Sequence, residues 1–508
     1  VEQSPATEPE TGPSTKGEPQ DISNEAAAPT SRLKREVGLA SATALLIGAV
    51  IGSGIFVTPS TVFRNSGSIG VVLIVWFVSG VTSIIGGVWE GGYSASCILS
   101  AEHSGEVSGS TWRGEGVRVL QVQNSCCDVL QSQGCSRCCF GEHYSSRTNA
   151  IKSGSESPQY DINHNGVLTN LLFSALATLV NCISVKTSAR VQDVLSSIKC
   201  LVLLSIIFTG AAFSFKENHL LDRPFFTTDT KAENVVFAFY GAIFSYGGWR
   251  QISHIAEEIK NPTRNIPLAL FAGIFAITII YMGTNVAYFV VLDAATIAST
   301  DAIAVSFAVA TWGSIAATVI PICVAVSCFG TLCAGYFSSA RVMLAAGRQG
   351  HLPLIFSFIT VDTSLPLTSI LLRGCLAFGY TFAGSVEVLI AGGVFLESLA
   401  DVFIVLTLFV LRVTMKDAPR PYHVPTALAI FKLLVSVALI VLPFLRPVEY
   451  LQYIVMVSIG IVCCVYYVMF VRFRLVLPGS REATCVVQRL LMCVPCVNEL
   501  ELMLKEKL

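Results

Sequence analysis

The chain has 508 residues, of which 53% are hydrophobic and only 13% are charged. Soluble domains carry about 25% charged residues, so this composition excludes an ordinary soluble protein and indicates a membrane protein with many spans. The formal net charge of −1 offers no basic excess and gives no support to a nucleic-acid partner.

The first 35 residues are expected to form a disordered cytoplasmic tail. Residues 1–30 are rich in Glu, Pro, Ser and Thr and contain few apolar residues that could be buried. The basic stretch RLKRE follows at residues 32–36, directly before the first apolar run. Because basic residues remain on the cytoplasmic side of a membrane, this stretch assigns the N-terminus to the cytoplasm.

Apolar runs of about 20 residues, the length that crosses a bilayer as a helix, occur eleven times. They are residues 38–58, 69–88, 166–184, 192–213, 235–255, 266–291, 307–339, 365–384, 386–411, 426–446 and 448–471. The basic loops all fall on the cytoplasmic side only if one more span crosses between residues 89 and 165. We therefore expect an all-α membrane protein with 12 transmembrane helices and both termini in the cytoplasm. Its membrane domain covers residues 36–475, and residues 476–508 form a cytoplasmic C-terminal tail.

Residues 89–157 lie where the third span is expected. The segment is hydrophilic, rich in Ser, Gly and Cys, and shows neither a helical nor a strand period. We interpret it as a gene-model error, of frame or splicing, that replaces the third span. The alternative is an extramembrane zinc module, because Cys135 and Cys138 have the spacing of zinc ligands, although no second such pair accompanies them.

Two spans carry glycines in their interior, where each costs a helix about 1 kcal/mol relative to alanine. One reads GAVIGSGIF at residues 48–56, and the other reads FYGAIFSYGGWRQISHIAEE at residues 239–258. Unwound backbone is tolerated in a bilayer only where it is buried in protein or lines a polar cavity. These two spans are the first and sixth of twelve, as an inverted five-plus-five repeat requires. The alternative is that both glycine sets are close-packing faces between helices.

Transporters use broken spans to bind their substrates. Backbone amides freed at Gly52, Ser53 and Gly54, together with the positive end of the half-helix that follows, bind an anionic group such as a carboxylate. The first break is therefore predicted to be a binding site.

Several segments resemble the L-type amino-acid transporters, the light chains of heteromeric amino-acid exchangers in the amino acid–polyamine–organocation superfamily. They read IGSGIFVTPSTVFRNSGSIG, VNCISVKTSARVQD, FSYGGWRQISHIAEEIKNPTRNIPLAL, SSARVMLAAGRQGHLP and DAPRPYHVP. The resemblance covers about residues 36–88 and 166–475. It implies a leucine-transporter-type fold, a third span within the anomalous segment, and no cofactor.

The resemblance also implies a substrate site at the two breaks. Its residues are Val50, Ile51, Ser53, Gly54 and Ile55 in the first span and Phe244, Gly247 and Arg250 in the sixth. Phe244 would be the gating aromatic over the substrate, and the carbonyl of Gly247 would neighbour its ammonium. An uncharged polar residue is usual at the position of Arg250. An added cation there is expected to disfavour cationic substrates, and it could favour an acidic side chain.

Lys199 is another charge at apparent membrane depth, where an ammonium needs a carbonyl-lined partner. The resemblance places it near the sodium site of sodium-coupled relatives, which makes it a substitute for sodium. The alternative is that Lys199, about two turns from Asp193, reaches the membrane interface.

Further acidic residues lie near the sixth and tenth spans. Glu257 and Glu258 are interpreted as neutralising the end of a cytoplasmic helix, with a gating salt bridge to Arg190 or Arg341 as the alternative. Glu397 lies deep in an apolar run and is a candidate for the substrate pathway.

The function predicted from the sequence is sodium-independent exchange of neutral, large L-amino acids across the plasma membrane. Exchange of anionic or cationic amino acids and a non-transporting amino-acid sensor are the alternatives. No catalytic set falls at a common membrane depth, so an enzyme is not expected. The resemblance implies a single-span glycoprotein heavy chain as partner. The linking cysteine is not identifiable, because residues 153–167 contain none and the five upstream cysteines fall within residues 89–157.

Overall fold

The computed structural model describes residues 37–104, 164–215, 232–300, 302–348, 350–360, 365–380, 386–414, 425–441, 444, 450–473 and 480–495. All of them belong to one compact unit, Leu33–Cys496. The predicted N-terminal tail, the paired cysteines of the zinc alternative and the cysteines considered for a heavy-chain link lie outside the described residues.

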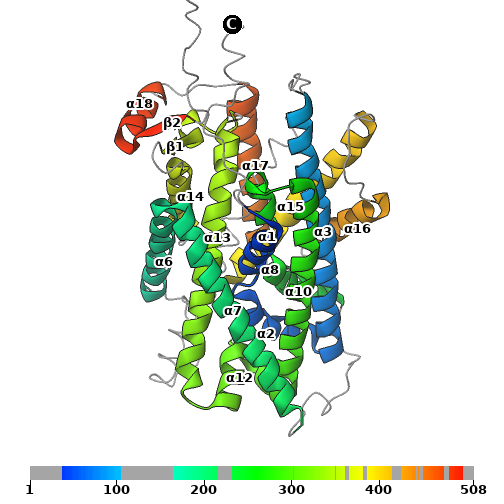
Figure 1. The fold of residues 1–508 in the computed structure, drawn as a ribbon. Helices are drawn as coiled ribbons and strands as arrows, with labels where there is room; N and C mark the ends of the chain where they lie inside the picture. Colours follow the sequence, from blue (N-terminus) through cyan, green and yellow to red (C-terminus); the bar gives the residue numbers. More distant parts are fainter. Residues whose placement is uncertain are drawn as a thin grey trace, which may run out of the picture. The chain divides into compact units, whose positions relative to one another are not determined.

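The described residues are mostly helical (Figure 1). The helices are α1 (Leu39–Val50), α2 (Gly54–Ser66), α3 (Ile69–Ser104), α6 (His164–Ile183), α7 (Val185–Phe213), α8 (Ala232–Tyr246), α9 (Gln251–His254), η2 (Ala256–Glu258), α10 (Pro262–Val291), α11 (Ala294–Ser299), α12 (Ile303–Trp312), α13 (Ala316–Arg348), η3 (Leu354–Ser357), α14 (Leu367–Tyr380), α15 (Val386–Thr414), α16 (Thr426–Val441), α17 (Tyr450–Tyr466), η5 (Tyr467–Arg472) and α18 (Ser480–Leu491). Each of the eleven expected spans coincides with at least one helix, so the predicted all-α fold is confirmed.

The lengths and surfaces of these helices suit a bilayer. Among the described residues, 5 helices are long and apolar enough to cross a membrane, the bent pair α1 and α2 raises the number to 6, and parts of α6, α12, α14, α16 and the α17–η5 segment form shorter apolar helices. Large apolar side chains on the outer faces are exposed, among them Phe208, Leu179 and Phe275 at 70%, 62% and 52%. Exposure of so many large apolar side chains is unfavourable in water and agrees with surfaces that contact lipid.

The structure differs from the sequence prediction around residues 307–339. This run is counted as one span from the sequence, but it contains two helices, α12 and α13, separated at Gly313–Ile315. Gly313 has φ +83°, a backbone conformation that glycine adopts without steric cost. Uniform hydrophobicity hides this break, because apolar residues continue on both sides of it.

A second difference concerns the anomalous segment. We expected no helical period from residue 89 onward, whereas α3 is helical for 36 residues and continues to Ser104. A helix that is already formed gains one hydrogen bond for each added residue, so it can extend into a stretch that would not start a helix. The remainder of residues 89–157 lies outside the described residues.

The core of the unit forms around the first span. α1 packs against three long helices, α7, α10 and α13, and α10 also runs along α3 (Figure 1). Trp76 of α3 is fully buried there, with its ring centroid 5.9 Å from Tyr246 of α8 and 5.4 Å from Tyr281 of α10. Aromatic pairs at these separations add favourable packing energy, and they fix the surroundings of both predicted breaks.

A short sheet involves part of the predicted C-terminal tail. Strand β1 (Phe358–Thr360) pairs antiparallel with β2 (Cys493–Pro495) in the register Phe358↔Pro495, Ile359↔Val494, Thr360↔Cys493. Residues 493–495 therefore pair with the connection between α13 and α14, and α18 precedes this strand.

Candidate functional site

The first span is broken where the glycines predicted it. α1 ends at Val50, α2 begins at Gly54, and the two helices are bent by 49°. Ile51 is extended, with φ −71° and ψ 95°. The five residues implied by the resemblance in this span are buried, and they line the break: Val50, Ile51, Ser53, Gly54 and Ile55.

The other predicted break lies at Gly247–Arg250, between α8 and α9. Gly248 has φ +96°, so the turn needs a residue without a Cβ. Gly247 donates to the carbonyl of Phe244 at 3.0 Å, and the ring of Phe244 is buried in the last turn of α8. Both interrupted spans of the sequence prediction are thus interrupted in the structure.

The two breaks lie against each other. A Cβ added to Gly54 would stand 2.5 Å from the Oγ of Ser245, and one added to Gly248 would stand 2.8 Å from the carbonyl oxygen of Ala49. The hydroxyl groups of Thr58 and Ser245 are 2.7 Å apart. Only glycine permits these approaches, which lie below the closest separations of real Cβ atoms. The close-packing alternative and the broken-helix prediction therefore describe the same glycines.

Tyr281 of α10 joins the two breaks through its hydroxyl. The oxygen lies 3.2 Å from the carbonyl of Val50, where α1 ends, and 3.1 Å from the carbonyl of Ser245 near the end of α8. The last carbonyls of a helix have no donor within it, so a side chain from a third helix supplies one.

Lys199 supplies another donor at the same helix end. Its ammonium is buried, at 1% exposure, and donates to the carbonyl of Gly48 and to the hydroxyl of Thr331, each at 2.8 Å. Thr331 lies 3.1 Å from the carbonyl of Ile51 and donates to it. The ammonium thus has the carbonyl-lined partner that its depth requires, and the alternative in which Lys199 reaches the membrane interface is wrong.

Arg250 follows the second break, but its charge is not isolated. Its guanidinium donates to Asp401 and lies 3.5 Å from the carboxylate of Glu397, both on α15. Asp401 also receives the ammonium of Lys432 from α16 at 2.7 Å and lies 3.3 Å from the hydroxyl of Ser436. We name Arg250, Glu397, Asp401 and Lys432 the charge quartet. Two cations and two carboxylates leave it formally neutral.

The quartet corrects one premise of the sequence analysis. The expected exclusion of cationic substrates treated Arg250 as an unpaired charge, and the structure pairs it with two carboxylates. Glu397 was identified from its depth in an apolar run. Asp401 and Lys432 were missed, although each carries the same signal, a charge within an apolar helix.

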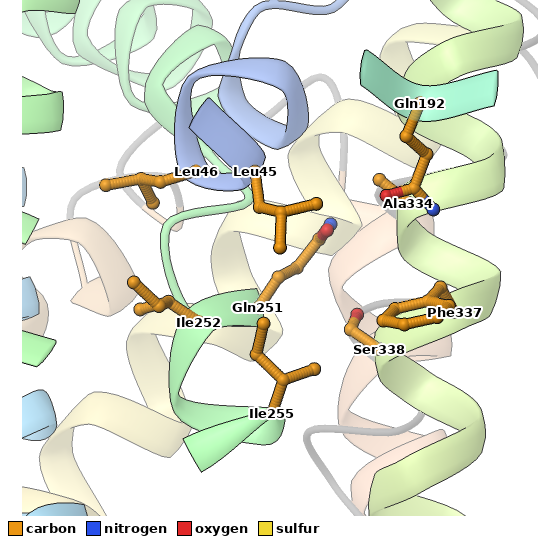
Figure 2. Close-up of a pocket in the computed structure, with 9 residues that line it drawn as sticks. All are labelled: Leu45, Leu46, Gln192, Gln251, Ile252, Ile255, Ala334, Phe337 and Ser338. Atoms are coloured by element: carbon orange, nitrogen blue, oxygen red, sulfur yellow. The ribbon is translucent and has the colours of Figure 1, made fainter. Parts of the chain in front are cut away.

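A cavity lies beside the two breaks, on the side where α1 begins and α9 ends. It is a small, partly open pocket of about 20 Å³ between α1, α7, α9 and α13. Figure 2 shows the residues that line it: Leu45, Leu46, Gln192, Gln251, Ile252, Ile255, Ala334, Phe337 and Ser338. The amide groups of Gln192 and Gln251 turn toward this space, and Ser338 adds a hydroxyl to the otherwise apolar lining.

Contacts on the same side join α9, α13 and the start of the first span. Arg341, one turn along α13 from the lining residue Phe337, donates to Glu258. The amide of Val37 donates to the carbonyl of Glu258 at 3.0 Å, and the carbonyl of Val37 accepts from the amide of Lys260 at 2.9 Å. Of the two partners considered for a gating salt bridge, Arg341 makes the contact, whereas Arg190 is exposed.

Comparison with known proteins identifies the family. A family model described as amino acid permease matches residues 149–470. The b(0,+)-type amino acid transporter 1 of Mus musculus is 30% identical over 486 residues, which cover 92% of this chain and 94% of its own. The cystine/glutamate transporter of Homo sapiens is 31% identical over 421 residues, 80% of each chain. The large neutral amino acids transporter small subunit 2 of Homo sapiens is 30% identical over 418 residues, 79% of this chain and 74% of its own.

These relatives confirm the resemblance to the L-type amino-acid transporters and the prediction that the chain is not an enzyme. The chain belongs to the amino acid permease family and is a multi-pass membrane protein that transports amino acids.

Proposed function

We propose that this chain exchanges neutral, large L-amino acids without sodium, by alternating access at the plasma membrane with both termini in the cytoplasm. The observation that carries the proposal is the contact between the two broken helices, because it brings the start of α2 and the end of α8 together. The amides at Ser53, Gly54 and Ile55 lie at the positive start of α2, which favours a carboxylate. The carbonyls near Gly247 lie at the negative end of α8, which favours an ammonium.

The arrangement around α1 supports sodium independence. In a sodium-coupled transporter, carbonyls at an unwound helix coordinate the ion. Here the carbonyl of Gly48 accepts from Lys199, and that of Ile51 accepts from Thr331, which in turn accepts from Lys199. A fixed ammonium thus lies at a helix end that would otherwise attract a cation.

The charge quartet supports a neutral substrate. Because its two cations and two carboxylates cancel, the second break presents no net charge to the side chain of a bound amino acid. The large neutral amino acids transporter small subunit 2 is a relative at 30% identity, which supports the preference for large neutral side chains. The cystine/glutamate transporter is similar at 31%, so an anionic substrate is the second candidate, with Arg250 as the group that would bind it.

A heavy chain is the proposed partner. One relative is named a small subunit, and the resemblance implies a single-span glycoprotein. Co-expression with such a glycoprotein, followed by non-reducing electrophoresis, would test the link. A disulfide-linked species that disappears on reduction supports it.

Counterflow in proteoliposomes tests the transport proposal. The full chain is reconstituted with unlabelled leucine inside and labelled leucine outside, in sodium or in choline medium. We expect equal accumulation of label in both media and little accumulation without internal leucine. Loss of uptake in choline would contradict sodium independence, and uptake without internal amino acid would contradict exchange. Binding of leucine without any counterflow would favour the sensor.

The role of Phe244 is tested in the same assay. Phe244→Ala removes a buried ring at the second break and is expected to lower the affinity for leucine. The matched control is Phe208→Ala, which removes a ring that is 70% exposed on the outer face of α7. An equal effect of both variants would argue against a gating role for Phe244.

A further inference from the structure

Asp401 is the centre of the charge quartet, because each of its carboxylate oxygens has a partner. Oδ1 accepts from the guanidinium of Arg250, and Oδ2 accepts from the ammonium of Lys432 at 2.7 Å and the hydroxyl of Ser436 at 3.3 Å. Glu397 lies one turn earlier on α15, 3.5 Å from Arg250, with a side chain that is 14% exposed. Asp401 thus binds two cations, one from the turn before α9 and one from α16.

Burial makes this pairing consequential. The side chains of Arg250, Asp401 and Lys432 are 6%, 9% and 11% exposed. Removing one partner of a buried ion pair leaves an uncompensated charge in a region of low dielectric, where it acts strongly on its surroundings. Arg250 adjoins the turn at Gly247 and Gly248, so the uncompensated charge would stand beside the second break.

The direction of the Arg250 guanidinium determines whether a substrate side chain can pair with it. Arg250 extends from the second break toward α15, where Asp401 binds it. An acidic substrate side chain that approached the guanidinium would compete with two carboxylates already in place. A neutral side chain meets no such competition.

We propose that Asp401 is a specificity-determining residue that holds Arg250 against α15 and so keeps the substrate site electrically neutral. The inference rests on the proposed function and deepens it, because it assigns the preference for neutral over anionic amino acids to one carboxylate. Lys432 contributes to the same neutrality. It reaches Asp401 from α16 and balances the second carboxylate of the quartet.

The proposal predicts a change of substrate when the carboxylate is lost. Asp401→Asn leaves Arg250, Lys432 and Glu397, a net charge of +1 beside the second break. At an effective dielectric of about 20, a unit charge near a bound anion changes binding by roughly ten-fold or more. We therefore expect the ratio of glutamate to leucine binding to rise by about ten-fold in this variant.

The experiment compares Asp401→Asn with three other variants of the full chain. Asp401→Glu keeps the charge, and Arg250→Asn with Asp401→Asn removes both partners, so each is expected to retain the preference for leucine. Asp293→Asn is the matched control, because Asp293 caps the short helix α11 and lies away from the quartet. Each variant is assayed for counterflow of labelled glutamate and leucine and for thermal stabilisation by each amino acid in detergent.

The ratio of the two substrates distinguishes specificity from a merely structural role. A structural defect lowers the response to glutamate and leucine together, whereas the proposal requires a rise in their ratio in Asp401→Asn and its reversal in the double variant. An unchanged ratio of glutamate to leucine in Asp401→Asn overturns the inference. If the unmodified chain still exchanges leucine, the proposed function is unaffected by that result. If Asp401→Asn does not fold, a double variant that folds and gains a preference for glutamate overturns the inference instead. Failure of the unmodified chain to respond to any amino acid contradicts the proposed function itself.

Discussion

Gly248 lies so close to α1 that an added Cβ would stand 2.8 Å from the carbonyl oxygen of Ala49. Its φ of +96° is also a conformation that other residues adopt at a cost of about 1–2 kcal/mol. Gly248→Ala is therefore expected to separate the two breaks and to lower leucine counterflow at least ten-fold. Gly379→Ala is the matched control, because nothing lies within 4 Å of a Cβ there. Wild-type transport by Gly248→Ala would show that the breaks need not touch.

Lys199→Met is expected to lower both stability and transport. The substitution removes the donor to Gly48 and Thr331, and a buried acceptor left unsatisfied costs about 1–3 kcal/mol. Thermal unfolding in detergent and counterflow in choline are the measurements, and Lys260→Met, at an exposed lysine, is the control. If Lys199→Met retains full sodium-independent exchange, Lys199 is not a substitute for sodium.

Arg250→Asn is expected to favour cationic amino acids. The substitution leaves Lys432 with two carboxylates, Glu397 and Asp401, so the net charge of the quartet becomes −1. Competition of labelled leucine uptake by lysine should then strengthen several-fold, since attraction between opposite charges at an effective dielectric of about 20 is on the order of a few kcal/mol before screening. Equal competition by lysine in Arg250→Asn and the unmodified chain would mean that the quartet lies beyond the reach of the substrate side chain.

Glu258→Gln is expected to open the cavity beside the breaks. The substitution removes the carboxylate that receives Arg341, one turn from the lining residues Phe337 and Ser338. A cysteine placed at Ser338 should then react faster with a water-soluble thiol reagent, measured against the same chain without that cysteine. The exchanged pair, Glu258→Arg with Arg341→Glu, should restore slow modification. Glu482→Gln, at an exposed residue of α18, controls for the loss of a carboxylate elsewhere.

The anomalous segment can be tested at the level of the transcript. Sequencing should restore an apolar third span of about 20 residues in place of residues 89–157. The match of the b(0,+)-type amino acid transporter 1 of Mus musculus over 92% of this chain and 94% of its own length agrees with a replacement that leaves the length between its flanks little changed. A confirmed transcript that keeps the segment would contradict this interpretation.

The breaks were predictable from the sequence because their cause is local. Glycines within an apolar span are unfavourable unless backbone contact or unwinding requires them, and Gly54 and Gly248 fulfil both conditions. The need of Lys199 for carbonyl partners was also predictable, since any ammonium at that depth has it.

The partners of the charges were not predictable, because they depend on tertiary packing. Arg250 and Asp401 are separated by 151 residues, and hydropathy shows only that each stands in an apolar region. The effect of Arg250 on a substrate therefore cannot be predicted from that residue alone, because Asp401 on a helix distant in the sequence neutralises its charge. The break at Gly313 was missed for a related reason, since apolar residues on both sides resemble one continuous span.

The hydroxyl of Tyr281 has a single hydrogen, yet the carbonyls of Val50 and Ser245 both lie within its reach. It can donate to only one of them at a time. Whichever carbonyl the Tyr281 hydroxyl donates to, the other carbonyl at the junction of the two broken helices lacks this donor. In the proposed exchange cycle, the ammonium of an arriving amino acid brings three hydrogens to this junction. The substrate ammonium can thus donate to whichever of the two carbonyls does not receive the hydrogen of the Tyr281 hydroxyl.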